Sequence, residues 1–178
     1  MKSALLGAML VGSCVLPQVV PEARGDFHAT GTIARGALTS GFDGARVVSP
    51  NLELARRTDG SWGGRFSQAG SGLTQAMDVS VEGDVVRGVD FLMRRERAGD
   101  RTIITGTFKA KSFRFELWKD GFSAHTTRYS AEFAGRQAQP DGSIRFGDEG
   151  ALVMAGDAVA LDPIAWPQLA FALFGAFY

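Results

Sequence analysis

Short turns containing Gly and Asp recur along this chain, and they constrain its fold more than any other feature. They are Asp59-Gly60, Glu82-Gly83-Asp84, Gly99-Asp100, Asp120-Gly121 and Asp141-Gly142. Gly and Asp adopt the positive φ values that tight hairpins need, and the intervening segments are rich in Val, Ile, Thr, Phe and Trp. This spacing predicts an all-β domain: an antiparallel meander of roughly eight strands that curves into a barrel-like or half-barrel sheet.

The clearest predicted hairpin joins residues 77–81 to residues 85–93 through Glu82-Gly83-Asp84. Its odd-numbered apolar residues would share one buried face, because side chains alternate along a strand. These residues are Met77, Val79, Val81, Val85, Val89, Phe91 and Met93. Arg87 interrupts the pattern opposite Val79, and we expect it at a rim, where its stem covers apolar surface and its charge stays in water, or else in a polar cavity.

A second hairpin is expected around Asp120-Gly121, with Glu116 opposite His125. One face of this hairpin would carry Phe113, Phe115 and Leu117. The other would carry polar and aromatic residues that form a tentative ligand pocket: Arg114, Glu116, Trp118, His125 and Tyr129. Aromatic residues on both faces suggest that both are covered, either by closure of the sheet around a cavity or by a helix lying across it.

The pairing of Glu116 with His125 has two interpretations. A carboxylate beside an imidazole orients a general base, but no Gly-x-Ser-x-Gly elbow accompanies the nearby serines. A solvated sheet face with a cross-strand ion pair is the simpler interpretation. We therefore predict a protein that is not an enzyme. No cofactor motif is present, and the two histidines, His28 and His125, are too far apart in sequence for a zinc motif.

The segment from Pro163 to Tyr178 contains no charged side chain. Pro167 suits the first turn of a helix, and the Gln, Leu and Ala residues after it favour continuation. At 1.5 Å per residue such a helix would be about 18 Å long, too short for a bilayer, so we expect it to be buried against the sheet or in a barrel end. A strand remains an alternative, because larger and smaller residues alternate here, and an aromatic last residue resembles the ending of outer-membrane barrels.

The N-terminus has the form of an export signal. Lys2 supplies a positive start, residues 4–11 form a short apolar core, and Gly12 and Ser13 precede Cys14, the only cysteine. The end of this segment resembles the lipobox of bacterial lipoproteins, which implies lipid attachment at Cys14; Val15 after it implies the outer membrane. The predicted organisation is a signal peptide (1–13), a lipid-anchored tether (14–25) and a single β-rich domain (26–178). The alternatives are ordinary cleavage further along the chain, after Ala23, and no export.

The balance of charges argues against one class of function, nucleic-acid binding. Nineteen basic and nineteen acidic residues balance, so the basic footprint of a nucleic-acid-binding protein is missing. We expect an exported, lipid-anchored envelope protein with its domain facing the periplasm or the cell surface, which binds or scaffolds another envelope protein. The alternative is a lipocalin-like carrier of a small hydrophobic molecule or lipid, with a cavity lined by Phe91, Phe113, Phe115 and Phe122.

Overall fold

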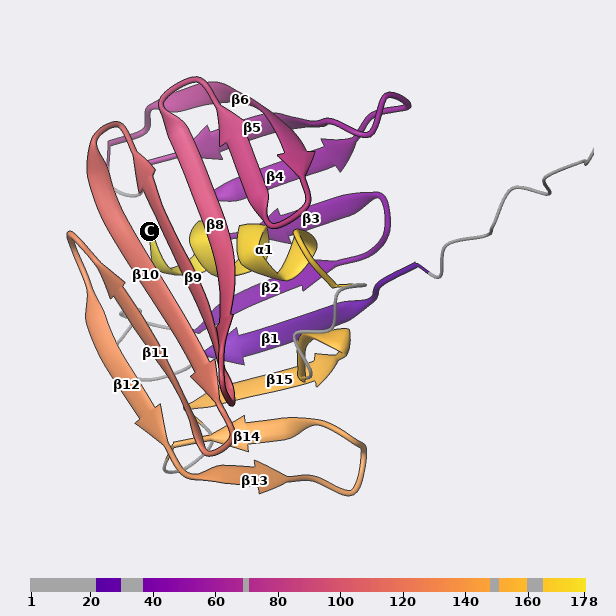
Figure 1. Ribbon diagram of the computed structural model, residues 1–178, viewed down its shortest axis with the longest axis vertical. Helices are drawn as coiled ribbons and strands as arrows, with labels where there is room; N and C mark the ends of the chain where they lie inside the picture. Colours follow the sequence, from indigo (N-terminus) through magenta and orange to yellow (C-terminus); the bar gives the residue numbers. More distant parts are fainter. Residues whose placement is uncertain (1–21, 30–36, 69–70, 148–150, 160–164) are drawn as a thin grey trace, which may run out of the picture.

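The protein is a nearly closed antiparallel β-barrel with one helix inside it (Figure 1). The computed structural model describes residues 22–29, 37–68, 71–147, 151–159 and 165–178. Within these residues a single sheet has fifteen strands. The strands are β1 (Gly25–Ala29), β2 (Leu38–Phe42), β3 (Arg46–Ser49), β4 (Leu52–Arg56), β5 (Trp62–Ser67), β6 (Thr74–Glu82), β7 (Val85–Gly88), β8 (Phe91–Ala98), β9 (Arg101–Phe108), β10 (Lys111–Trp118), β11 (Gly121–Thr126), β12 (Ser130–Ala134), β13 (Arg136–Ala138), β14 (Ile144–Phe146) and β15 (Leu152–Gly156).

The topology is a meander that returns to its own beginning. Strands β1 to β12 follow one another in the sheet, and β15 pairs with the free side of β1, so that β12 and β13 form the two edges. These edge strands are consecutive in the chain and are separated by Gly135, whose φ is 84°. The predicted antiparallel meander with a barrel-like shape is therefore confirmed.

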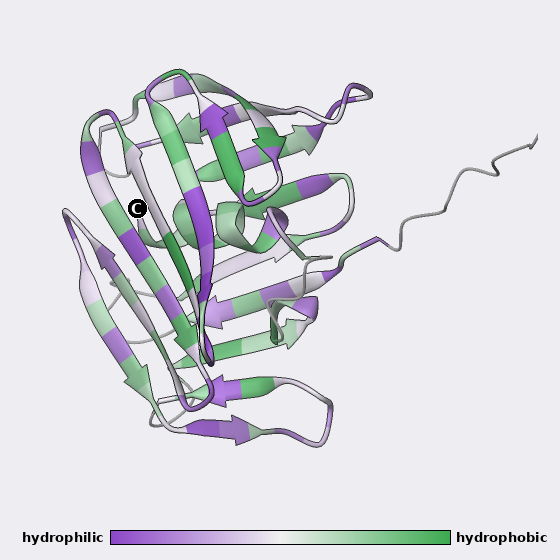
Figure 2. Ribbon diagram, in the orientation of Figure 1, coloured by the Kyte–Doolittle hydropathy of each residue, from purple (hydrophilic) through white to green (hydrophobic). Residues whose placement is uncertain are grey.

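The C-terminal helix α1 (Gln168–Phe177) lies inside the curved sheet, as Figure 1 shows. A short 3-10 helix, η2 (Asp157–Val159), follows β15. All ten residues of α1 are buried, and most of its ribbon has the green of hydrophobic residues in Figure 2. This confirms the predicted short apolar helix and excludes the alternative of a strand. A helix that is apolar on every side is stable only where none of its sides faces water. The interior of the barrel is such a place.

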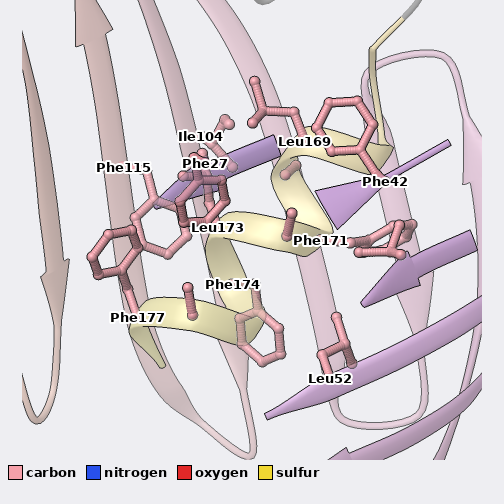
Figure 3. Close-up of a cluster of buried hydrophobic side chains, with 14 of the residues drawn as sticks. Phe27, Phe42, Leu52, Ile104, Phe115, Leu169, Phe171, Leu173, Phe174 and Phe177 are labelled. Atoms are coloured by element: carbon pink, nitrogen blue, oxygen red, sulfur yellow. The ribbon is translucent and has the colours of Figure 1, made fainter. Parts of the chain in front are cut away.

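Aromatic side chains of α1 fill the space between the walls (Figure 3). Phe174 packs against Phe91, Phe108 and Phe113, with ring centroids 5.1 to 5.6 Å apart. Near the end of the helix, Phe177 reaches rings on β1, β10 and β11. The core of the domain is therefore the contact between helix and barrel wall.

Hydrogen bonds also attach α1 to the wall. The Ser49 hydroxyl donates to the carbonyl of Ala172 at 3.0 Å, and the backbone N–H of Asn51 donates to the carbonyl of Gly175 at 3.1 Å. Beyond the helix, the Tyr178 hydroxyl donates to the carbonyl of Phe108 at 3.0 Å. These bonds fix the position of the helix along and around its axis, which apolar packing alone specifies less sharply.

The sheet has more strands than the roughly eight expected, and two of the additional boundaries are turns without glycine. The segment 85–93, predicted as one strand, is divided by a turn at Val89-Asp90 into β7 and β8. Val89 lies in this turn and is 87% exposed. The β6–β7 turn consists of two residues, Gly83 and Asp84, instead of the predicted three, so Val86 pairs with Val81 in the core and Val85 is only half-buried. Arg87 pairs with Ser80 instead of Val79 and is exposed. A similar turn at Lys109-Ala110 separates β9 from β10.

The predicted signal peptide, Cys14 and most of the tether lie outside the described residues. The end of the tether belongs to the folded domain, because Ala23 is 1% exposed and the backbone N–H of Arg24 donates to Asp157 at 2.9 Å. Gly25 is already the first residue of β1. The packed domain therefore begins by Ala23, within the predicted tether.

Candidate functional site

The hairpin that carries the predicted pocket residues has a different register from the expected one. Lys119 and Asp120 form the turn, and Gly121 is the first residue of β11, paired with Trp118. Gly121 cannot carry a side chain there, because a Cβ would lie 2.4 Å from the Trp118 ring. Consequently Glu116 lies opposite Ser123, and the predicted pairing of Glu116 with His125 is wrong.

Glu116 is the centre of an ionic cluster on the outer face of the barrel. Its two carboxylate oxygens accept from Arg114 Nε at 2.6 Å and from Arg101 Nη1 at 3.0 Å. The guanidinium of Arg101 also lies over the Trp118 ring, 5.1 Å from its centroid. Hydrogen bonding from Arg114, followed by that from Arg101, lowers the pKa of Glu116 despite partial desolvation. A carboxylate held in its charged form by two arginines is a poor general base.

The other two predicted residues point to different places. His125 lies opposite Arg114 and is exposed, with Nδ1 2.8 Å from Ser130 Oγ. Tyr129 faces the interior and stacks on Phe177 with a centroid distance of 5.6 Å. The structure thus places Arg114, Glu116, Trp118 and His125 on the outer face and separates Tyr129 from them.

The residues expected to line a central cavity pack against α1. Phe91 and Phe113 contact Phe174, whereas Phe115 and Phe122 contact Phe177. Two buried hydroxyls nearby, Tyr129 Oη and Ser40 Oγ, have no hydrogen-bond partner among the described residues. Burial also raises the pKa of Tyr129. Helix α1 therefore occupies the space inside the barrel where the lipocalin-like alternative places a ligand.

A cleft of about 780 Å³ lies at the N-terminal end of α1. Its apolar lining includes Trp62, Val81, Trp166 and Pro167, and its charged lining comprises three carboxylates and one guanidinium: Glu22, Asp59, Glu82 and Arg56. The residues come from the entry of the chain into the domain, the β4–β5 turn, the β6–β7 hairpin and the start of α1. Its volume falls within the range of about 300–1,000 Å³ typical of ligand sites.

Trp166 is held at this cleft by the β6–β7 hairpin and β8. Its indole Nε1 donates to the carbonyl of Gly83 at 2.8 Å, and the guanidinium of Arg95 lies 5.0 Å from its ring centroid. Arg95 is itself oriented by Asp84, whose carboxylate accepts from Nε at 2.8 Å. The side chain of Arg95 is 11% exposed, so the stack is well shielded from water. The indole is consequently fixed at the rim before any ligand arrives.

Sequence reasoning missed this cleft because its parts are far apart in the chain. In the sequence Trp62 follows the Asp59-Gly60 turn, and Trp166 precedes Pro167 at the start of the helix. Each is a common residue in such a setting, and only the fold brings them together. Within the cleft, the Ser61 hydroxyl donates to Asp59 at 2.6 Å. This contact fixes the β4–β5 turn and lowers the pKa of Asp59.

The fold and the site define a class of protein: an antiparallel β-barrel filled by its own C-terminal helix, with an open cleft where that helix begins. Comparison of the chain with protein-family models, curated proteins and solved structures found no match. Among the described residues, no three His, Cys, Asp or Glu side chains are grouped as metal ligands. None of the described helices combines the length and apolar character needed to cross a membrane.

Proposed function

We propose that this chain is an exported, lipid-anchored envelope protein whose barrel is a binding module rather than an enzyme. The observation that carries the proposal is the cleft between Trp62 and Trp166. Its mixed lining suits a small molecule, or a segment of an envelope partner, that has an apolar group and a polar or cationic end.

The position of the cleft relative to the proposed anchor supports this function. Glu22 and Ala23 line the cleft, and Glu22 follows Cys14 by eight positions in the sequence. Eight extended residues span at most about 29 Å. A lipid at Cys14 would therefore hold the cleft close to the membrane surface, where it meets lipids, membrane-derived molecules and other membrane-anchored proteins.

Native mass spectrometry of the protein released from its own membrane tests the cleft. The expected wild-type spectrum contains a non-covalent adduct, which Ser80→Trp loses because the new indole fills the cleft from an exposed rim position. Trp118→Ala is the matched control, because it removes an indole from the outer face and should keep the adduct. The same adducts in wild type and Ser80→Trp, or none in wild type, would contradict the proposed site.

A second candidate is the lipocalin-like carrier, and the unpartnered hydroxyls of Tyr129 and Ser40 favour it. Buried polar groups normally have a partner, and a ligand in the interior would supply one after displacing α1. Envelope lipids added to the protein should then accelerate amide hydrogen exchange across Leu169–Phe177. Unchanged exchange at saturating lipid would count against the carrier.

A further inference from the structure

We propose that the end of the barrel opposite the cleft carries a second binding site, specific for an oxyanion attached to an apolar tail. The site is a pocket of about 90 Å³ at the C-terminal end of α1. It lies where the β5–β6 loop, the β9–β10 turn and the β11–β12 turn approach Tyr178. This proposal is independent of the cleft and of the lipid anchor.

The floor of the pocket is apolar. Phe66, Phe108 and Tyr178 form an aromatic cluster in which Phe66 and Phe108 each contact Tyr178, with ring centroids 6.1 and 5.6 Å away. Leu73 completes the lining and is 69% exposed, an unusual position for a large apolar side chain. At about 30 Å³ per water-sized group, the pocket accommodates about three non-hydrogen atoms of a tail.

The rim of the pocket is basic. Lys109, Lys111 and Arg128 line it together with two glutamines, and its lining contains no carboxylate side chain. The described residues provide no ion pair to these three cations. In a chain whose charges balance overall, three unpaired cations around one apolar pocket select an anion by charge complementarity.

The backbone of one of these basic residues, Lys109, has an unusual conformation. Lys109 and Ala110 have φ values of 49° and 63°, a region that residues other than Gly seldom occupy. The turn nevertheless places Lys109 Nζ 5.6 Å from the Phe108 ring centroid, directly beside the pocket. The ligand class follows from both parts: a carboxylate, phosphate or sulfate at the rim, with the first atoms of an alkyl or acyl tail on the aromatic floor.

Titration of the full chain with octanoate, followed by amide NMR shifts, tests the site. We expect saturable shifts at Leu73, Lys109 and Lys111, with octanoate binding at least tenfold more tightly than acetate or neutral octanamide. The double variant Lys111→Gln/Arg128→Gln should weaken binding at least tenfold. Lys119→Gln is the matched control, because it removes a cation from the turn at the other end of β10 and should change affinity less than twofold.

Two further experiments separate ligand recognition from folding and identify the source of the anion. Lys109→Asn removes the charge but keeps a residue that tolerates positive φ, so weaker binding with unchanged stability separates recognition from folding. Sedimentation with vesicles of phosphatidylcholine, with and without phosphatidylglycerol, distinguishes sources of the anion: binding only to anionic vesicles, lost in the double variant, identifies a membrane headgroup. The proposal is overturned if octanoate causes no saturable shift and anionic vesicles bind the double variant as well as the wild type.

Discussion

Gly175 lies against Ser49 so closely that the helix and the barrel wall leave no room for a methyl group between them. A Cβ at residue 175 would fall 2.6 Å from the Cβ of Ser49 and 2.5 Å from that of Leu52. The carbonyl of Gly175 also accepts the hydrogen bond from Asn51. The closest approach of α1 to the wall therefore depends on a glycine within the helix, where glycine is otherwise unfavourable.

Gly175→Ala should destabilise the fold. Alanine would gain about 1 kcal/mol of helix propensity, but overpacking at a fixed backbone contact costs about 1–3 kcal/mol. We expect a net loss of up to about 2 kcal/mol in the free energy of unfolding, measured by urea denaturation. Gly41→Ala is the control, because nothing lies within 4 Å of a Cβ there. Equal stability of Gly175→Ala and wild type would show that the barrel wall shifts to make room for the added methyl group.

Phe174→Ala should be among the most damaging single changes in the protein. Phe174 is fully buried and contacts the rings of Phe66, Phe91, Phe108, Phe113 and Tyr178. Removing a buried Phe side chain costs about 3–5 kcal/mol, which thermal or urea unfolding would detect. Val89→Ala, at a residue 87% exposed, should change stability by less than about 0.5 kcal/mol. A similar small effect at Phe174 would contradict a packed interior.

Tyr129→Phe should leave the fold as stable as wild type or more stable. The hydroxyl is buried and has no hydrogen-bond partner within the part of the chain that the structure describes. Its removal therefore eliminates a desolvation cost of about 1–3 kcal/mol, while the ring keeps its stack on Phe177. The free energy of unfolding in urea measures the effect. A clear loss of stability would show that the hydroxyl has a partner in solution.

Glu116→Gln should lower stability at neutral pH but not at acid pH. The native pKa of Glu116 lies below its ordinary value of 4.5, chiefly because Arg114 hydrogen-bonds the carboxylate. A lowered native pKa gives stabilisation that is complete above the unfolded pKa and is lost as the pH falls through the native pKa. Since Arg114 and Arg101 are about half exposed, we expect a difference of about 0.5–1 kcal/mol at pH 7.

Urea denaturation of both proteins between pH 7 and pH 3 checks this dependence. The difference should be constant down to about pH 5 and shrink below pH 4.5. Glu132→Gln supplies the comparison, because Glu132 is exposed and forms no ion pair with the described residues. A difference that grows on acidification would have the wrong sign for this mechanism.

Cys14→Ser should abolish membrane retention in fractionated cells and leave the circular dichroism of the β-domain unchanged. The proposed lipid is attached through the cysteine thiol, which serine lacks, and Cys14 precedes the described residues, which begin at Glu22. Ser13→Ala keeps a small residue before the cysteine and should retain both the anchor and its acyl mass. If the Cys14→Ser protein still sediments with membranes, the proposed anchor is wrong.

The sequence specified the sheet well where turns contain glycine. Gly83 and Gly99 have positive φ and lie in the β6–β7 and β8–β9 turns, as predicted. The turns at Val89-Asp90 and Lys109-Ala110 were missed because neither contains glycine, although Asp90, Lys109 and Ala110 all have positive φ. Lys and Ala carry no turn signal, and Asp90 has no Gly beside it. As a result, the boundaries between β7 and β8 and between β9 and β10 were not predicted.

Predictions for the candidate site were also limited by what local sequence can specify. The register error on β10 and β11 moved each pairing by two residues, which preserves the face of every side chain. Arg114, Glu116 and Trp118 consequently shared a face as predicted, while the partners of Glu116 changed. Tyr129 was misplaced because residues 127–129 leave the strand between β11 and β12, where alternation no longer applies. The cleft at Trp62 and Trp166 depends on contacts across more than 80 residues and has no local signature.

The position of α1 at the end of the chain has a consequence for how this protein folds. The helix packs on β2, β3 and β4, and the bond from Ser49 to Ala172 joins residues 123 positions apart. The wall strands are synthesised first, yet their apolar faces stay unfilled until the last segment arrives. Folding should therefore be slow and end in a step that needs α1, because the walls cannot bury their apolar faces before the helix docks.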